Sequence, residues 1–229
     1  MLKGFLVTVV LLISAAQVIS AENTNSCYTG SEEARADELQ KCIDLAKNGD
    51  ASAQYFLWRT FEKNAKSKKD LESAMKLLLA SASQGYTEAE YDLGLQFEQA
   101  GTTEQHSVEA AKWYLKAANK KHASAMNNLG KMYQFGNGGL EKSTTKAVEL
   151  YLSAAEKMNV DAVFNLGIIY TAAKEQRASY FWFSVGSLMG DKESLLRVEQ
   201  LDSSNADRDK PEITKEAKNW VRLVRKMNN

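Results

Sequence analysis

The stretch from Gly85 to Lys121, GYTEAEYDLGLQFEQAGTTEQHSVEAAKWYLKAANKK, decides the fold of this 229-residue chain. Small and large apolar residues recur in it at helical spacing on both sides of a polar turn. The residues before the turn are Ala89, Leu93, Gly94 and Phe97, and those after it are Ala110, Trp113, Tyr114, Ala117 and Ala118. The stretch therefore predicts two antiparallel helices.

The same pattern repeats along the chain. Thirty-six positions after Ala89 it returns as Ala125, Leu129, Gly130 and Tyr133, followed by Ala147, Leu150, Tyr151, Ala154 and Ala155. An earlier copy spans about Gly49 to Gln84, and a later one begins at Ala162 with a shorter turn. A fixed period in this range is typical of helical arrays. We expect an all-α fold: a right-handed α-solenoid of antiparallel helix hairpins, with about four full repeats plus N- and C-terminal capping helices.

Residues 1–21 are predicted to be a signal peptide. Lys3 is followed by an almost wholly apolar run from Gly4 to Val18, and small residues precede Glu22. The run is short for a membrane span, which needs about 20 apolar residues, so export is favoured over anchoring. We expect a periplasmic or secreted protein with no integral membrane span after cleavage.

The remaining chain divides into three parts. Residues 22–48 are expected to form an N-terminal cap, residues 49–201 the repeats, and residues 202–229 a C-terminal capping helix that starts near Pro211. Cys27 and Cys42 are the two cysteines of the chain, and an exported protein favours a disulfide between them. The loop that this bond closes would contribute about 3 kcal/mol in the chain-entropy model.

The repeated residues resemble the Sel-one-like repeat family, relatives of the tetratricopeptide repeats. The family's pattern is matched nearly throughout by Ala125, Leu129-Gly130, Tyr133, Gly136-Asn137-Gly138, Ala147, Leu150-Tyr151 and Ala154-Ala155. The first repeat departs from it, with Trp58 at the glycine position, and the fourth has a shortened turn. The resemblance implies a solenoid that binds other proteins.

The sequence offers little support for an enzyme. Two SxxK motifs occur, Ser73 to Lys76 and Ser143 to Lys146, but neither an SDN nor a KTG partner motif accompanies them. Ser143 stands where a helix N-cap belongs. His106 and His122 fall near turns and are expected to be solvated. We predict no catalytic residue, no cofactor and no metal. The 29 acidic and 29 basic residues balance, so nucleic acid is not an expected partner.

The candidate site is the inner, concave face of the solenoid, to which the first helix of each hairpin contributes positions not used for packing. Counting from each repeat's alanine gives Tyr55, Phe56, Arg59, Tyr91, Asp92, Leu95, Asn127, Asn128, Lys131, Phe164, Asn165 and Ile168. Apolar, amide and charged groups alternate, as a peptide or protein groove would require. The alternative is that Tyr91 and Phe164 pack between hairpins, and that Asn128 and Asn165 merely follow the family pattern.

These observations predict a non-enzymatic, exported protein–protein interaction module. Exported members of the family include immunity proteins that neutralise periplasm-acting toxins such as phospholipase effectors, and a small single-domain array suits that role. The alternatives are an envelope adaptor, a host-directed binding protein, or an SxxK-type cell-wall enzyme.

Overall fold

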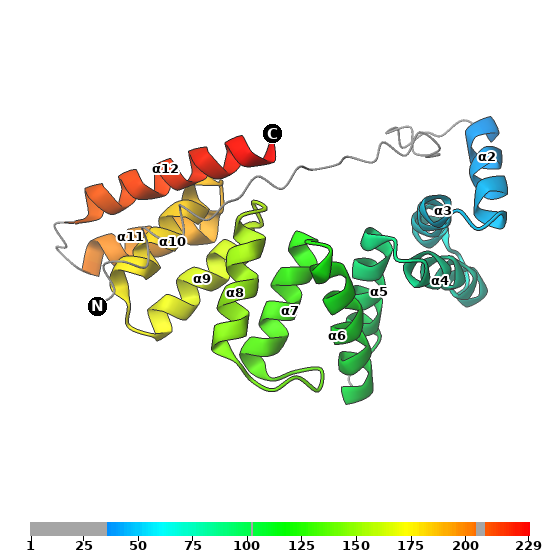
Figure 1. Ribbon diagram of the computed structural model, residues 1–229, viewed down its shortest axis with the longest axis horizontal. Helices are drawn as coiled ribbons and strands as arrows, with labels where there is room; N and C mark the ends of the chain where they lie inside the picture. The colour runs from blue at the N-terminus through cyan, green and yellow to red at the C-terminus, as the bar shows by residue number, and fades with distance from the viewer. Residues whose placement is uncertain (1–35, 102, 205–208) are drawn as a thin grey trace.

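The computed structural model describes residues 36–101, 103–204 and 209–229, and within these ranges every regular element is a helix (Figure 1). The helices are α2 (Ala36–Lys47), α3 (Ala51–Asn64), α4 (Lys68–Ser83), α5 (Thr87–Ala100), α6 (Glu104–Asn119), α7 (Ala123–Phe135), α8 (Thr144–Ala155), α9 (Val160–Ala172), α10 (Gln176–Leu188), α11 (Lys192–Ser204) and α12 (Lys210–Asn228).

The helices form a curved array of antiparallel pairs. Four hairpins follow one another along the chain, α3–α4, α5–α6, α7–α8 and α9–α10, and each packs on the next. Helix α2 packs on α3 at one end, while α11 and α12 both pack on α10 at the other (Figure 1). The predicted α-solenoid is confirmed.

A glycine in the first helix of a hairpin faces an aromatic ring from the second. A Cβ atom added to Gly94 would lie 2.7 Å from the Tyr114 ring, and one added to Gly130 would lie 2.7 Å from the Tyr151 ring. Tyr114 and Tyr151 are fully buried, so neither ring has room to retreat. The recurring Leu-Gly pair therefore lets two helices approach with a large ring between them.

The helix starts are fixed by side-chain caps. Ser67, Thr103, Ser143 and Asn159 each accept a hydrogen bond from the backbone N–H three residues on. Ser143 thus has the N-cap position predicted from the sequence. The turn after α7 begins at Gly136, whose φ of 77° is left-handed and favours glycine.

The last helix, α12, buries one stripe against α10. Ile213, Ala217, Val221 and Val224 are buried. The half-buried Trp220 makes an edge contact with Trp182 at 5.4 Å between ring centroids.

Two sequence predictions fall on residues that the structure does not describe. The signal peptide 1–21 and Cys27 lie outside the described ranges, so cleavage and the disulfide to Cys42 stay predictions. Cys42 itself is fully buried in the core between α2 and α3. Among the described helices, none combines the length and the apolar character that crossing a membrane requires.

Candidate protein-binding face

The first helices of successive hairpins, α3, α5, α7 and α9, reach one another across the repeat boundaries. Gln96 Nε2 of α5 donates to Glu62 Oε1 of α3 at 2.9 Å, and Asn165 Nδ2 of α9 donates to Asn127 Oδ1 of α7 at 2.9 Å. Helices on the tighter side of an arc approach most closely. We call the surface that these four helices share the inner face.

The N-terminal half of the inner face carries an aromatic and acidic group. Tyr55 Oη donates to Asp92 Oδ2 at 2.6 Å, which joins α3 to α5. Burial raises the pKa of the Asp92 carboxyl, although the hydrogen bond from Tyr55 opposes the shift. Arg59 is exposed beside this pair. Tyr91 stacks on His122, with 4.5 Å between ring centroids and 26° between ring planes.

The C-terminal half of the inner face contains a cavity of about 370 Å³ between α7, α9 and α11. Its lining residues are Asn127, Asn128, Lys131, Val160, Asp161, Phe164, Asn165, Asp191 and Glu193. The side chains of Asn127 and Asn128 are buried, at 4% and 9% exposure, and they form its floor. Asn127 Oδ1 accepts from Asn165, and Asn127 Nδ2 donates to Asn128 Oδ1 at 3.4 Å, so the three amides form one linked polar group at the cavity.

A second cavity of about 240 Å³ opens beside the first and shares Asn128 and Lys131 with it. It extends toward Glu98 of α5 and toward Phe135, which is 63% exposed at the end of α7. We call the two cavities together the groove. It runs from α11 across the inner face to α5.

The structure brings together five of the predicted site residues and separates the others from them. Asn127, Asn128, Lys131, Phe164 and Asn165 all line the first cavity. Tyr55, Arg59, Tyr91 and Asp92 lie on α3 and α5, outside the lining of either cavity. Phe56, Leu95 and Ile168 are half-buried and do not line the groove either.

Tyr91 and Phe164 each contact an aromatic ring from the second helix of their own hairpin, whereas the alternative interpretation placed them between hairpins; the stacking of Tyr91 on His122 does reach the next hairpin. Tyr91 lies 6.0 Å from Tyr114, and Phe164 lies 5.6 Å from Phe183, between ring centroids. Phe164 nevertheless keeps a surface in the first cavity, so packing and exposure are combined in one side chain.

Sequence reasoning missed the acidic side of the groove. Asp161 precedes the alanine of the fourth repeat, and Asp191 and Glu193 lie at the start of α11. Asp191 Oδ2 accepts from the backbone N–H of Ser194 at 2.8 Å. In the sequence, Asp191 directly after Gly190, at a helix-capping position, was the one signal for this acidic side.

The expectation that both histidines are solvated was wrong. His122 is half-buried and is the N-cap of α7, where its Nδ1 accepts from the Ala125 N–H at 3.2 Å. His106 is half-buried as well, and its Nδ1 lies 2.9 Å from Thr103 Oγ1. Both rings have local structural partners.

The cap made by His122 predicts a pH dependence of stability. Burial lowers the pKa of His122 below its usual value, although the negative charges of Glu88 and Asp92 act to raise it. The unfolded chain therefore takes up a proton first, and stability is lost as the pH falls from about 7.5 through about 6.5. His122→Asn, which copies the Asn159 cap of α9, removes this titration. In urea unfolding, the wild type is expected to lose stability relative to His122→Asn between about pH 7.5 and about pH 5.5; a constant difference would contradict this role.

The serines of the two SxxK motifs are engaged in helix structure. Ser143 Oγ caps α8, and Ser73 Oγ donates to the Lys69 carbonyl at 2.8 Å within α4. Across the described ranges, no three His, Cys, Asp or Glu side chains are grouped so as to hold a metal ion.

Comparison with known proteins agrees with the repeat pattern. The model of the Sel1 repeat matches residues 65–86, 87–122 and 123–157. A search of curated proteins gave no significant match. Two solved structures are similar in fold. One is a protective antigen present in uropathogenic Escherichia coli strains and displaying an SLR fold, with a TM-score of 0.70 and 22% identity over 82% of this chain. The chain spans 40% of that antigen's length.

The other is a Sel1 repeat protein from Oxalobacter formigenes, with a TM-score of 0.65 and 22% identity. That match covers 83% of this chain and 79% of the other. At this level of identity the likeness establishes the fold alone. Sel1 repeats are typically non-catalytic modules for protein–protein interaction. Residues 65–157 therefore carry three Sel1 repeats, and the chain shares its solenoid fold with these proteins.

Proposed function

We propose that the chain is an exported, non-enzymatic protein that binds a segment of another protein in the groove of its inner face. The proposal rests on the buried pair Asn127 and Asn128, which floor a cavity open to solvent. Paired amides can satisfy the backbone N–H and C=O groups of an extended peptide. The half-buried Phe164 and the exposed Phe135 offer apolar contact along the same path.

The charges of the groove set a preference for the bound segment. Asp161, Asp191 and Glu193 lie at the α11 end, whereas Lys131 lies between the two cavities. A partner segment with a basic side chain at the α11 end and an acidic one near Lys131 would be complementary.

A charge reversal in the groove tests this proposal. Lys131→Glu combined with Asp161→Lys changes two exposed side chains of the cavity and leaves the net charge unchanged. Capture of partners from an envelope extract is expected to fall at least tenfold, because rim charges that oppose the partner's disfavour association. The matched control is Lys142→Glu with Glu149→Lys, two exposed residues of the α7–α8 turn and α8. Equal capture by the groove variant and the wild type would place the binding surface elsewhere.

An immunity role is the more specific form of the proposal. A small array of four hairpins could neutralise a toxin acting in the periplasm by covering the mouth of its active site. Co-expression with a lipase-like toxin encoded beside this chain should restore growth, and the groove variant should fail to do so. Rescue by neither protein would favour the envelope adaptor or the host-directed binding protein, and labelling of Ser73 or Ser143 by a fluorescent penicillin would favour the enzyme.

A further inference from the structure

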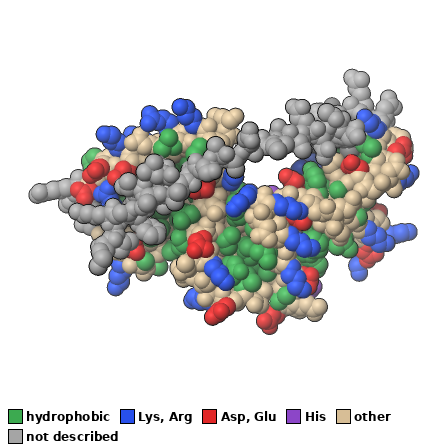
Figure 2. All heavy atoms as spheres, viewed as in Figure 1, with side chains coloured by type: hydrophobic (Ala, Val, Ile, Leu, Met, Phe, Trp, Pro, Cys, Tyr) green, Lys and Arg blue, Asp and Glu red, His purple; other side chains and the backbone are tan. Residues whose placement is uncertain are grey.

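Helix α12 carries an excess of basic residues in a chain that is neutral as a whole. It holds six Lys or Arg residues against two Glu, while the whole chain has 29 of each sign. Glu216, one of the two, is paired with Arg177 at 2.9 Å. Figure 2 shows Lys and Arg side chains gathered along the upper-left edge of the molecule, over α12.

Four of these cations form one line. Lys215, Lys218, Arg222 and Lys226 follow one another at intervals of three or four residues, so they share one side of the helix. We call them the basic stripe. All four are exposed, and none lies within ion-pair distance of a described carboxylate. The buried stripe that starts at Ile213 holds the opposite side of α12 on α10, so the basic stripe faces outward.

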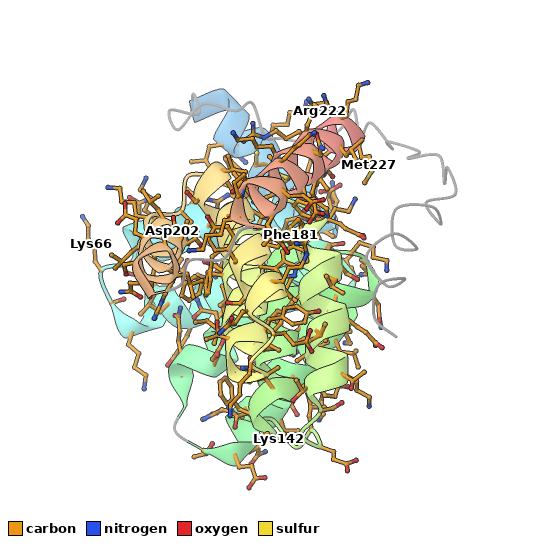
Figure 3. All side chains as sticks on the ribbon, turned by 90° about the vertical axis from the view of Figure 1, so that its left-hand side faces the viewer. Lys66, Lys142, Phe181, Asp202, Arg222 and Met227 are labelled. Carbon is orange, nitrogen blue, oxygen red and sulfur yellow. The ribbon has the colours of Figure 1, made fainter. Side chains whose placement is uncertain are left out.

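Two exposed apolar side chains lie to one side of the basic stripe, each about 100° further around the helix than the cation before it. Leu223 and Met227 follow Arg222 and Lys226 directly, and they are 46% and 50% exposed. In Figure 3, Arg222 and Met227 lie together at one end of the molecule. A helix that merely covers the end of a solenoid would not need exposed apolar residues beside its cations.

A structural role explains part of the charge but not the stripe. Arg225 and Lys226 in the last turn favour the helix dipole, and Arg225 also lies 3.4 Å from the Leu188 carbonyl. Lys215 and Lys218 lie too far from the C-terminus of α12 for that effect, which fades within one turn. Their positions therefore call for another explanation.

We infer that the basic stripe rests on an anionic lipid surface, with Leu223 and Met227 along one edge of the contact. A helix of 19 residues presents a ridge about 28 Å long, and the two cavities of the groove lie on other elements. Such a ridge suits a flat surface of negative charges better than a single acidic peptide. Peripheral helices combine cations and apolar residues in this way. Contact through α12 leaves the groove free to bind its partner.

Co-sedimentation with lipid vesicles tests the inference. The full chain is expressed with its N-terminal segment and mixed with vesicles of phosphatidylcholine, with or without phosphatidylglycerol. An apolar N-terminal segment would bind both kinds alike, so the difference between them reports the charge contribution. We expect binding that requires phosphatidylglycerol and weakens from about 0.1 M to about 1 M salt.

Neutralising the stripe is the decisive variant. Lys215→Gln, Lys218→Gln and Arg222→Gln together should lower phosphatidylglycerol-dependent binding roughly a hundredfold, at about fivefold per cation. The control removes three cations on exposed residues of α4 and the turn before it, Lys66→Gln, Lys69→Gln and Lys76→Gln. In Figure 3, Lys66 lies well away from Arg222. The control should bind as the wild type does.

Three results would overturn the inference. They are equal binding to both kinds of vesicle, an equal loss in the control, and capture of polyglutamate or duplex DNA without capture of vesicles. Leu223→Ser with Met227→Ser should weaken vesicle binding without changing its salt dependence. All the substituted residues are exposed, so thermal unfolding should stay unchanged and exclude misfolding as the cause.

Discussion

Replacing Trp58 with glycine is expected to lower the free energy of unfolding by about 3–5 kcal/mol, with up to about 1 kcal/mol more from glycine within a helix. Trp58 is 4% exposed and belongs to one core cluster with Leu78, which is fully buried. It occupies the position where Gly94 and Gly130 stand in the next two repeats. Removing the indole therefore opens a cavity between α3 and α4. Urea unfolding of the variant chain measures the loss.

In the first repeat, the large and the small residue of this contact have exchanged helices. Where the later hairpins set a glycine against Tyr114 or Tyr151, the first repeat sets Trp58 against Leu78. Leu78→Tyr alone should overpack the site and cost about 1–3 kcal/mol. Together with Trp58→Gly it recreates the contact of the later repeats, so we expect the pair to recover about 1–3 kcal/mol relative to the sum of the single changes.

The new hydroxyl would also have an acceptor. Tyr114 Oη donates to Glu98 Oε2 at 2.5 Å, and Glu62 stands at the corresponding place in the first repeat. The control is Trp58→Gly with Leu77→Tyr, in which the ring starts from a half-buried neighbouring position. Solenoids can unfold in parts, so amide hydrogen exchange in α3 and α4 should report the same coupling locally. Additive effects in both pairs would refute the inverted packing.

The helical array could be predicted from the sequence because the close approach of the helices restricts which residue types can stand at the recurring positions. A ring as large as that of Tyr114 or Tyr151 can pass beneath a neighbouring helix only at a glycine, and alanines let the remaining turns approach. The first hairpin departed from the pattern where two positions changed together, since Trp58 is compensated by Leu78. The fourth departs in the length of its turn but keeps the contact, because Gly167 receives Phe183, whose ring would lie 2.6 Å from an added Cβ. A single-position pattern cannot show such compensation.

The candidate site was predicted less completely, because half of it depends on tertiary approach. The helical offsets placed Asn127, Lys131 and Asn165 on one face. They could not show that Asn127 would be buried by its contact with Asn165, nor that α11 would bring Glu193 to the same cavity. The position of α11 depends on its packing against α10, and the sequence there does not follow the repeat.

Replacing Lys120 with methionine is expected to cost about 2–4 kcal/mol, which is the second large effect. Lys120 Nζ donates to Glu90 Oε1 at 2.8 Å, and the Glu90 side chain is 4% exposed. Glu90 Oε2 is buried and has no hydrogen-bond partner in the described part of the chain. Removing the lysine leaves a carboxylate buried without its counter-ion, which usually costs about 3–5 kcal/mol. We expect less here because the Lys120 side chain is 40% exposed, and water can partly replace it.

The neighbouring repeats show how the loss should be repaired. In the first repeat, Gln84 Nε2 donates to Gln54 Oε1 at 2.8 Å, at the positions equivalent to Lys120 and Glu90. In the third, the buried Met126 stands at the position of Glu90. Glu90→Gln with Lys120→Gln, and Glu90→Met with Lys120→Met, should therefore lie within about 1.5 kcal/mol of the wild type.

The salt dependence separates a buried charge from a surface ion pair. The deficit of Lys120→Met should persist from about 0.1 M to about 1 M salt, because ions in solution do not screen a charge enclosed by protein. Lys112→Met, which removes an exposed pair with Glu109 at 2.7 Å, is the matched control and should cost less than about 1 kcal/mol. If the two variants lost the same stability, and salt removed the difference from the wild type in both, Glu90 would be hydrated. The stability of the hairpin α5–α6 would then not depend on a buried charge.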